Sequence, residues 1–208
     1  MWNNIIYILG GLKLIGALYV TTIVFSLPLG ILFSLGEISK KRALSKIIQV
    51  YTWVFRGTPL LLQLFFVYYG LPVFGIVFAP FTAAAITFVI NYAAYFCEIF
   101  RGSIQGIGVG QYEAAKVLGM SYSQTMWRII LPQALITALP PLSNEGIALI
   151  KDVSIVSVIS MHDILRNAKE VVAREFTITP FVICGVIYLA LSTIIVLLFK
   201  KLEKKVSF

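Results

Sequence analysis

The sequence has 208 residues, of which 59% are hydrophobic and only 12% charged, with a mean hydropathy of +0.92. A soluble domain carries about 25% charged residues, so the composition excludes a soluble protein and indicates a multi-pass membrane protein. The formal net charge of +8 does not predict nucleic-acid binding, because the basic residues gather in alternate loops, as the positive-inside rule expects. Eleven of the seventeen fall in three such loops: Lys40, Lys41, Arg42 and Lys46; Arg101, Lys116 and Arg128; and Lys200, Lys201, Lys204 and Lys205.

Long uncharged runs predict the membrane-spanning helices, since a helix needs roughly 20 apolar residues to cross the bilayer core. Lys13 and Glu37 enclose 23 residues without a charge, and Arg56 and Glu98 enclose 41. In chain order we place five spans at residues 14–36, 48–69, 80–102, 131–150 and 178–199. We therefore expect an all-α fold with one transmembrane domain over residues 1–208, the N-terminus outside and the C-terminus in the cytoplasm.

Spans 2 and 3 each contain an ionisable residue at membrane depth, which is costly there and indicates a functional role. Arg56 lies in span 2 and Glu98 in span 3, so the two could form a structural ion pair, or Glu98 could bind substrate. Asn91, Tyr95 and Glu98 share one helical stripe at i, i+4 and i+7. Such a stripe either lines a translocation path or joins helices through polar contacts.

The segment between spans 3 and 4, residues 108–130, is moderately polar and rich in alanine. "GQYEAAKVLGMS" predicts a short helix that ends at Gly119, in the role glycine takes at a helix C-terminus. A second helix is expected to open on Ser121 as its N-cap. The first helix places Ala114, Val117 and Leu118 on one face, with Ala115 and Gly119 beside them. This face predicts either packing on the chain's own bundle or docking of another protein.

Span 4 contains Pro140 and Pro141, which remove two backbone donors, so we expect a kink or an interruption near mid-membrane. Ser143, Asn144 and Glu145 follow at once, and Glu145 is the deepest carboxylate in the chain. We expect a second interruption near "KDVSIVS", where the backbone N–H groups around Ser154 could bind a substrate carboxylate.

The loop after span 4 contains an amphipathic pattern, "MHDILRNAKEVVAREF", that predicts a short helix at the outer membrane surface. Asp163 opens this helix and is a third candidate carboxylate. His162, beside it, is expected to be an ordinary interfacial residue, with a pH-sensing or proton-relay role as the alternative. Cys97 and Cys184 lie inside apolar spans without the spacing of metal ligands, so we expect buried packing residues and no metal site. No side-chain pattern predicts a catalytic residue.

One pattern in the polar segment resembles a known family. Glu113, Ala114, Ala115, Gly119, Ile129, Leu131 and Pro132 match seven positions over twenty residues of the EAA signature found in the membrane subunits of bacterial ABC importers. "RGTPLLLQLFF", "NYAAYFCEIFRGSIQGI" and "ILPQALITALPPLSNEGIALIKDVSIVSVIS" further resemble permeases for polar amino acids. The resemblance extends over residues 11–199.

The resemblance implies a permease subunit that makes and breaks no covalent bond. In that family the EAA segment is the coupling helix that docks on a separate ATPase, so the implied coupling residues are Glu113, Ala114, Ala115, Val117, Leu118 and Gly119. The chain has no GxxxxGK[ST] loop, and ATP and Mg²⁺ are expected to bind to the partner ATPase. Further implied partners are a second permease subunit (the same chain or a close paralogue), an extracytoplasmic amino-acid-binding protein and the lipid bilayer of a bacterial cell membrane.

A free amino acid is a zwitterion, so its site needs both donors and acceptors. The substrate-binding candidates are Asn91, Tyr95, Glu98, Ser143, Glu145, Ser154 and Asp163. The three acids among them favour a polar L-amino acid and, within that class, a basic one. A self-sufficient transporter driven by an ion gradient is the main alternative, with Glu98, Glu145 and Asp163 as its relay, and a non-transporting scaffold subunit is the second.

Overall fold

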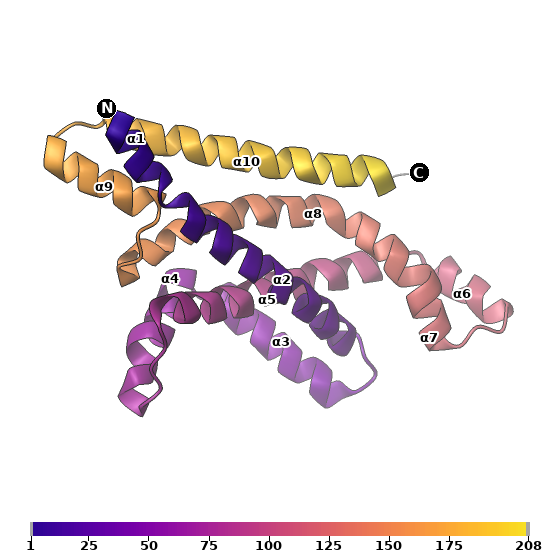
Figure 1. The fold of residues 1–208 in the computed structure, drawn as a ribbon. Coiled ribbons are helices and arrows are strands. Elements are labelled where there is room, and N and C mark those ends of the chain that lie inside the picture. The colour runs from indigo at the N-terminus through magenta and orange to yellow at the C-terminus, as the bar shows by residue number, and fades with distance from the viewer. Residues whose placement is uncertain (1, 207–208) are drawn as a thin grey trace.

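The computed structural model describes residues 2–206, and over that range the chain is helical with no β-strand. Its α-helices are α1 (Trp2–Leu9), α2 (Leu12–Glu37), α3 (Arg42–Gly57), α4 (Leu60–Phe65), α5 (Pro80–Gln105), α6 (Val109–Val117), α7 (Tyr122–Thr125), α8 (Leu131–Asp152), α9 (Ile164–Glu175) and α10 (Thr179–Val206). In Figure 1 the N-terminal helix α1 and α9 lie at one end of the bundle, and α6, α7 and the last turns of α10 lie at the other. The predicted all-α class is confirmed.

The centre of the bundle is the pair α2 and α5, which pack along most of their length (Figure 1). A glycine permits their close approach: a Cβ added at Gly30 would lie 2.5 Å from Cβ of Phe96. Ile15 and Leu18 of α2 and Phe88 of α5 are fully or almost fully buried in the same core. Helices α8, α9 and α10 extend this core on one side. Cys97 and Cys184 are both buried and unpaired, as predicted.

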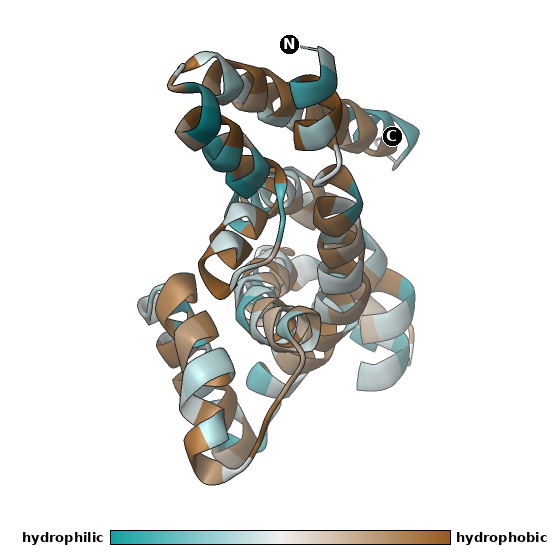
Figure 2. Ribbon diagram, turned by 60° about the vertical axis from the view of Figure 1, so that its left-hand side comes forward, coloured by the Kyte–Doolittle hydropathy of each residue, from teal (hydrophilic) through white to brown (hydrophobic). Residues whose placement is uncertain are grey.

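Hydrophobic residues cover most of the long helices, while hydrophilic residues gather on α9 beside the N-terminus (Figure 2). Three helical stretches within residues 2–206 are long and apolar enough to cross a membrane, namely Trp2–Glu37, Pro80–Gln105 and Thr179–Lys205. The first two contain predicted spans 1 and 3, and the third contains all of predicted span 5 except its first residue. A fourth is obtained if α3 and the helical segment after it count as one broken span. Helix α8 is not among these candidates, because polar and charged residues interrupt its apolar sequence. The count of five spans therefore stays a prediction.

Predicted span 2 is not one continuous helix. Helix α3 ends at Gly57, and the chain turns by 102° before the next helical segment, Leu60–Phe74. Proline causes the break, since Pro59 lacks a backbone donor and disfavours helical geometry in the residue before it. Thr58 accordingly has φ −118° and ψ 146°, in the extended region. The apolar run from residue 48 to 69 hid this break from the sequence reading.

The proline pair of span 4, unlike Pro59, does not break its helix. Helix α8 runs from Leu131 to Asp152 without an interruption at Pro140 and Pro141, although it follows a curved course in Figure 1. The expected second interruption is present: α8 gives way at Asp152 to a 3-10 helix, Val153–Ile159. Ser160 ends that helix with φ +65°.

The amphipathic helix predicted after span 4 forms as α9. Ile164, Ala168 and Val171 face the core, and the side chain of Asp163 caps the first turn. The helix also holds α1, which the sequence reading missed: Asn4 Nδ2 donates to the Glu175 carboxylate at 2.8 Å. Helices α1 and α9 thus contact each other through polar side chains at the end of the bundle opposite α6.

Candidate functional site

A cavity of about 640 Å³ lies where the break between α3 and α4 meets α5 and α8. This volume falls within the range of roughly 300–1,000 Å³ typical of small-molecule sites. Its polar lining combines one cation, two carboxylates, an amide and two phenols: Arg56, Glu145, Asp152, Asn91, Tyr92 and Tyr95. Of the sequence-predicted substrate residues, the structure brings together Asn91, Tyr95 and Glu145 here.

The break in predicted span 2 shapes one wall of this cavity. Gln63 Nε2 lies 2.9 Å from the carbonyl oxygen of Phe55 and 2.8 Å from Oγ1 of Thr58, so it compensates for hydrogen bonds that the break removes. Asn91 Nδ2 donates to the same Phe55 carbonyl at 2.9 Å and to Gln63 Oε1 at 3.0 Å. These two amides fasten the broken helix to α5, and Arg56 follows Phe55 at the edge of the cavity.

Arg56 is held between an aromatic ring and a carboxylate. Its guanidinium carbon lies 5.6 Å from the ring centroid of Tyr95, within cation–π distance. Its Nη1 lies 3.4 Å from Oε2 of Glu98, and the arginine side chain remains 42% exposed. This is the Arg56–Glu98 pair that the sequence suggested, and it leaves the cation accessible from the cavity.

Glu98 itself does not line the cavity. Its Oε2 also accepts from Arg101 Nη2 at 2.6 Å, and Arg101 Nε lies 3.3 Å from Glu37 Oε1. Glu98 instead borders a separate crevice of about 400 Å³ on the α5–α8 face, near Pro141. The side chain is therefore one member of a chain of alternating charges that runs from the cavity toward the end of α2.

The two cavity carboxylates lie on one face of α8, at i and i+7. Asp152 Oδ2 accepts a hydrogen bond of 2.8 Å from the buried Tyr92 hydroxyl, which fixes one carboxylate oxygen. Asp152 and Tyr92 were not predicted as site residues from the sequence. The available signal was the helical spacing of Asp152 from Glu145, just before the predicted interruption.

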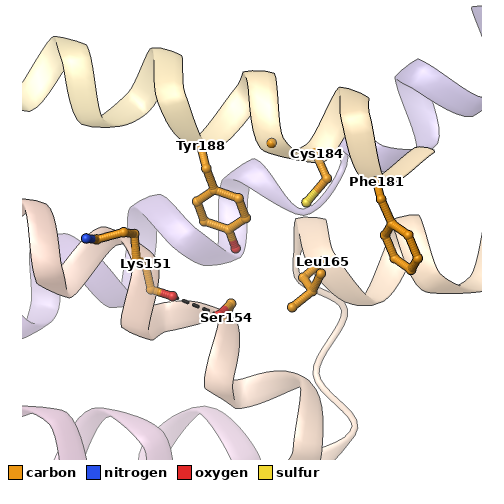
Figure 3. Close-up of a pocket in the computed structure, with 7 residues that line it drawn as sticks. Lys151, Ser154, Leu165, Phe181, Cys184 and Tyr188 are labelled. Atoms are coloured by element: carbon orange, nitrogen blue, oxygen red, sulfur yellow. Dashed lines mark hydrogen bonds between the residues drawn. The ribbon is translucent and has the colours of Figure 1, made fainter. Parts of the chain in front are cut away.

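Besides Glu98, three further predicted substrate residues lie outside the cavity. Ser154 borders a different crevice, of about 430 Å³, between the 3-10 helix, α9 and α10, and its Oγ donates to the Lys151 carbonyl at 2.8 Å. Figure 3 shows this crevice, with Tyr188 projecting from α10 toward the segment that carries Ser154 and Phe181 lying on the side of Leu165. Ser143 is partly buried in α8 and is not among the residues that line the cavity.

Asp163 is buried as the cap of α9. Its carboxylate accepts from the backbone N–H groups of Leu165 and Arg166, both at 3.0 Å, and from the Tyr188 hydroxyl at 3.3 Å. Burial raises the pKa of this carboxyl, and the two backbone donors oppose that shift. All the contacts of Asp163 described here are consistent with a structural role at the N-terminus of α9. His162 is exposed, with Nε2 3.5 Å from Oε1 of Glu170.

The second candidate site is helix α6 at the opposite end of the bundle. Gly119 follows it with φ +74°, and Ser121 and Gln124 form a capping box at the start of α7, so both predicted helix boundaries are confirmed. Val117 and Leu118 are 87% and 76% exposed, which is unusual for two adjacent apolar residues.

The remaining residues of the predicted coupling set divide between the two faces of α6. Glu113 and Ala114 are exposed on the side of Val117 and Leu118, whereas Ala115 is fully buried against the bundle. Helix α6 thus packs through one face and presents an apolar edge through the other. No contact within residues 2–206 covers that edge enough to remove it from solvent.

Comparison with known proteins identifies the family. The family described as "binding-protein-dependent transport system inner membrane component" matches residues 26–208. The arginine transport system permease protein ArtQ of Bacillus subtilis is 41% identical over 203 residues, which span 97% of this chain and 93% of ArtQ. The L-cystine transport system permease protein TcyB of the same organism is 41% identical over 166 residues, covering 80% and 71% of the two chains. A putative glutamine transport system permease protein GlnP of Rickettsia bellii is 36% identical, covering 97% and 94%.

Solved structures agree with this similarity. A crystal structure of an amino acid ABC transporter with histidines matches with a TM-score of 0.89 and 34% identity, covering 96% of this chain and 94% of that chain. The MetNI methionine ABC transporter, in an inward-facing conformation, shares the fold with a TM-score of 0.76 at 17% identity, covering 95% and 93%. The chain therefore belongs to the family of binding-protein-dependent transport system inner membrane components.

Proposed function

We propose that this chain is the membrane subunit of an ATP-driven importer for a basic L-amino acid, which binds in the cavity between Arg56 and the carboxylates of Glu145 and Asp152. The single observation that carries this proposal is the pairing of one cation with two carboxylates around a cavity of about 640 Å³. Membership of the family supports a role in transport, and the names of several relatives support an amino acid.

The charges of the cavity match those of a basic amino acid. Arg56 has donors for the α-carboxylate, because its guanidinium is 42% exposed and directs only one nitrogen at Glu98. One of the two α8 carboxylates would accept from the α-ammonium group, and the other from the side-chain cation. Tyr92 supports this role of Asp152, because its hydroxyl orients the carboxylate. An acidic amino acid would place a second negative charge among these acids, which is unfavourable.

The proposed substrate-binding residues are Arg56, Tyr95, Glu145 and Asp152, and Asn91 positions the wall that carries Arg56. For Glu98 we propose a structural role, since it bridges Arg56 and Arg101 from outside the cavity. Ser143, Ser154 and Asp163 were also sequence candidates, but their surroundings support structural roles in α8, the 3-10 helix and α9.

The exposed edge of α6 supports docking on a separate ATPase subunit, which would bind ATP and Mg²⁺. Val117 and Leu118 are the apolar contacts, Glu113 and Ala114 flank them, and Gly119 lets the chain turn away directly after the helix. The full importer would contain a second permease subunit and an extracytoplasmic binding protein. We retain five spans in a bacterial cell membrane, with the N-terminus outside and the C-terminus in the cytoplasm.

The test is ATP hydrolysis by the complete transporter in proteoliposomes. The binding protein is supplied on the side of the vesicle membrane where the outer face of the permease lies. Arginine, lysine, histidine, glutamine and glutamate are compared as stimulants. We expect stimulation by one or more of the three basic amino acids, and its loss in Val117→Asp. Val109→Asp is the matched control, because Val109 is also exposed but lies at the other end of α6. Stimulation by glutamate alone would contradict the substrate class, and full stimulation in Val117→Asp would contradict the docking role.

A further inference from the structure

A crevice of about 650 Å³ lies at the end of the bundle that carries α6 and α7, between the end of α2, the loop after it and the segment from Tyr122 to Trp127. None of the residues of the proposed substrate cavity takes part in it. Its inner surface is mainly apolar, with Leu35 from the last turn of α2, Ile38 directly after that helix and Met126 from the opposite side. Lys40 and Lys41 border it, and both lysines are exposed.

The positive charge at this crevice has no acidic partner within the described part of the chain. None of the ion pairs among residues 2–206 involves Lys40, Lys41 or the neighbouring Arg42 and Lys46. The acid closest in sequence, Glu37, is buried and paired with Arg101 instead. Four cations within seven residues therefore remain available to an external anion.

A polar atom in the crevice also lacks a partner. The hydroxyl oxygen of Ser39 is buried and makes no hydrogen bond with any residue in the range 2–206. Ser39 lines the crevice next to Lys40. A buried hydroxyl is normally satisfied, so an orphaned one beside two unpaired lysines indicates that an external acceptor completes this site.

The surroundings point to a lipid surface. Trp127 borders the crevice and is 63% exposed, and Tyr122 beside it is 62% exposed. Tryptophan and tyrosine are the side chains enriched where membrane meets water. Helix α3 begins at Arg42 and then exposes Ile47 and Trp53 on its outer face, so the basic residues adjoin an apolar surface. Basic groups beside such a surface attract anionic lipids.

We propose that this crevice is a binding site for an anionic phospholipid of the adjacent leaflet. The phosphate lies between Lys40 and Lys41 and accepts a hydrogen bond from the Ser39 hydroxyl, and an acyl chain lies against Leu35, Ile38 and Met126. An acidic protein surface would satisfy the lysines but not the apolar wall. A zwitterionic lipid has no net charge and brings its own cation close to the lysines, whereas an anionic lipid balances one of their two charges. This site goes beyond the proposed transport function and does not depend on the identity of the transported substrate.

The experiment measures quenching of Trp127 fluorescence by brominated lipids in nanodiscs that contain the full chain. The chain has three tryptophans, so Trp2→Phe and Trp53→Phe are introduced to leave Trp127 as the single reporter. Brominated phosphatidylglycerol is titrated into phosphatidylcholine, and the reverse titration uses brominated phosphatidylcholine. We expect phosphatidylglycerol to quench at a lower mole fraction, with about a fivefold loss of this preference for each lysine neutralised.

The variants Lys40→Gln/Lys41→Gln and Arg42→Gln/Lys46→Gln remove the same charge, but only the first pair lines the crevice. The preference for phosphatidylglycerol should fall in Lys40→Gln/Lys41→Gln and in Ser39→Ala. It should persist in Arg42→Gln/Lys46→Gln. Equal quenching by both lipids in the parent protein would overturn the proposal. An equal loss of lipid preference in the two double variants would also overturn it, because diffuse surface charge would then explain the preference. A loss of ATPase assembly in Lys40→Gln/Lys41→Gln with the lipid preference intact would overturn it too, because the lysines would then contact a protein partner.

Discussion

Two isosteric substitutions separate the roles of the glutamates in spans 3 and 4. Glu98 and Glu145 were both candidates for substrate binding, but only Glu145 lines the cavity. Glu98→Gln should therefore lower stability and leave substrate affinity essentially unchanged. Glu145→Gln should weaken substrate binding and leave stability essentially unchanged.

The stability loss in Glu98→Gln follows from its two arginine contacts. The contact with Arg101, at 2.6 Å, is a hydrogen bond between charged groups, of a kind worth about 1.5–3 kcal/mol. The contact with Arg56, at 3.4 Å to a side chain that is 42% exposed, is screened by solvent and worth less than about 1 kcal/mol. Glutamine retains an acceptor oxygen, and both arginines are partly exposed, so we expect a net loss of about 2 kcal/mol.

The affinity loss in Glu145→Gln follows from removing one of two carboxylates that face the ligand. A hydrogen bond to a charged group at about 1.5–3 kcal/mol corresponds to a weakening of roughly ten- to a hundredfold. Its stability should change little, because Glu145 forms no ion pair among residues 2–206.

The assays are reversible unfolding by sodium dodecyl sulfate in mixed micelles, followed by circular dichroism, and calorimetric titration of the folded transporter with arginine. Each variant is measured in both. If Glu98→Gln weakened arginine binding by about tenfold or more at unchanged stability, Glu98 would be a ligand and the assignment of the cavity would be wrong.

Other substitutions test the packing, the helix boundary and the α1–α9 contact. Gly30→Ala should cost about 1–3 kcal/mol in the same unfolding assay, because its Cβ would meet Phe96, whereas Gly16→Ala, with open space around it, should cost little; equal effects would contradict the tight α2–α5 packing. Gly119→Ala should cost about 1–2 kcal/mol for its φ of +74° alone, since no atom lies within 4 Å, and an unchanged unfolding midpoint would show that the turn relaxes. The hydrogen bond from the Tyr7 hydroxyl holds the pKa of Glu170 below its ordinary value of 4.5, so this contact stabilises the docked α1 above about pH 4.5 and is lost as the pH falls through the lowered pKa. Hydrogen exchange in α1, corrected for its intrinsic pH dependence, should rise as the pH falls below about 4.5. Tyr7→Phe should reduce this dependence without abolishing it, because the hydrogen bond from Asn4 of α1 also holds the pKa of Glu175 below its ordinary value.

Local signals predicted a large part of the fold. The uncharged runs located α2, α5 and α10, and the amphipathic spacing after span 4 located α9. Gly119 and Ser121 marked the end of α6 and the start of α7, because helix capping depends on a few adjacent residues. These features depend on neighbours in sequence, so a single sequence contains them.

The two proline sites show where local rules fail. Pro59 breaks its helix and Pro140 does not, although both lie in apolar runs. At the first site Gln63 and Asn91 satisfy the backbone around the break, and Asn91 comes from a different helix. Whether a proline interrupts a helix thus depends on tertiary partners that the local sequence does not contain.

The cavity shows the same limit. Asp152 is oriented by Tyr92, which is 60 residues away in the chain. Arg56 was identified as a partner of Glu98 but not as a cavity residue, because the break that exposes it was not predicted. Three of the cavity residues were nevertheless among the candidates, since polar side chains in an apolar helix are few.

The central claim is that this chain forms the path of an ATP-driven amino-acid importer. The most direct measurement is accumulation of labelled arginine in proteoliposomes that contain the complete transporter, with and without ATP, and with a proton or sodium gradient in place of ATP. We predict accumulation only with ATP, and its strong reduction in Asp152→Asn. Accumulation driven by a gradient through this chain alone, without ATP or an ATPase subunit, would contradict the account and identify a secondary transporter.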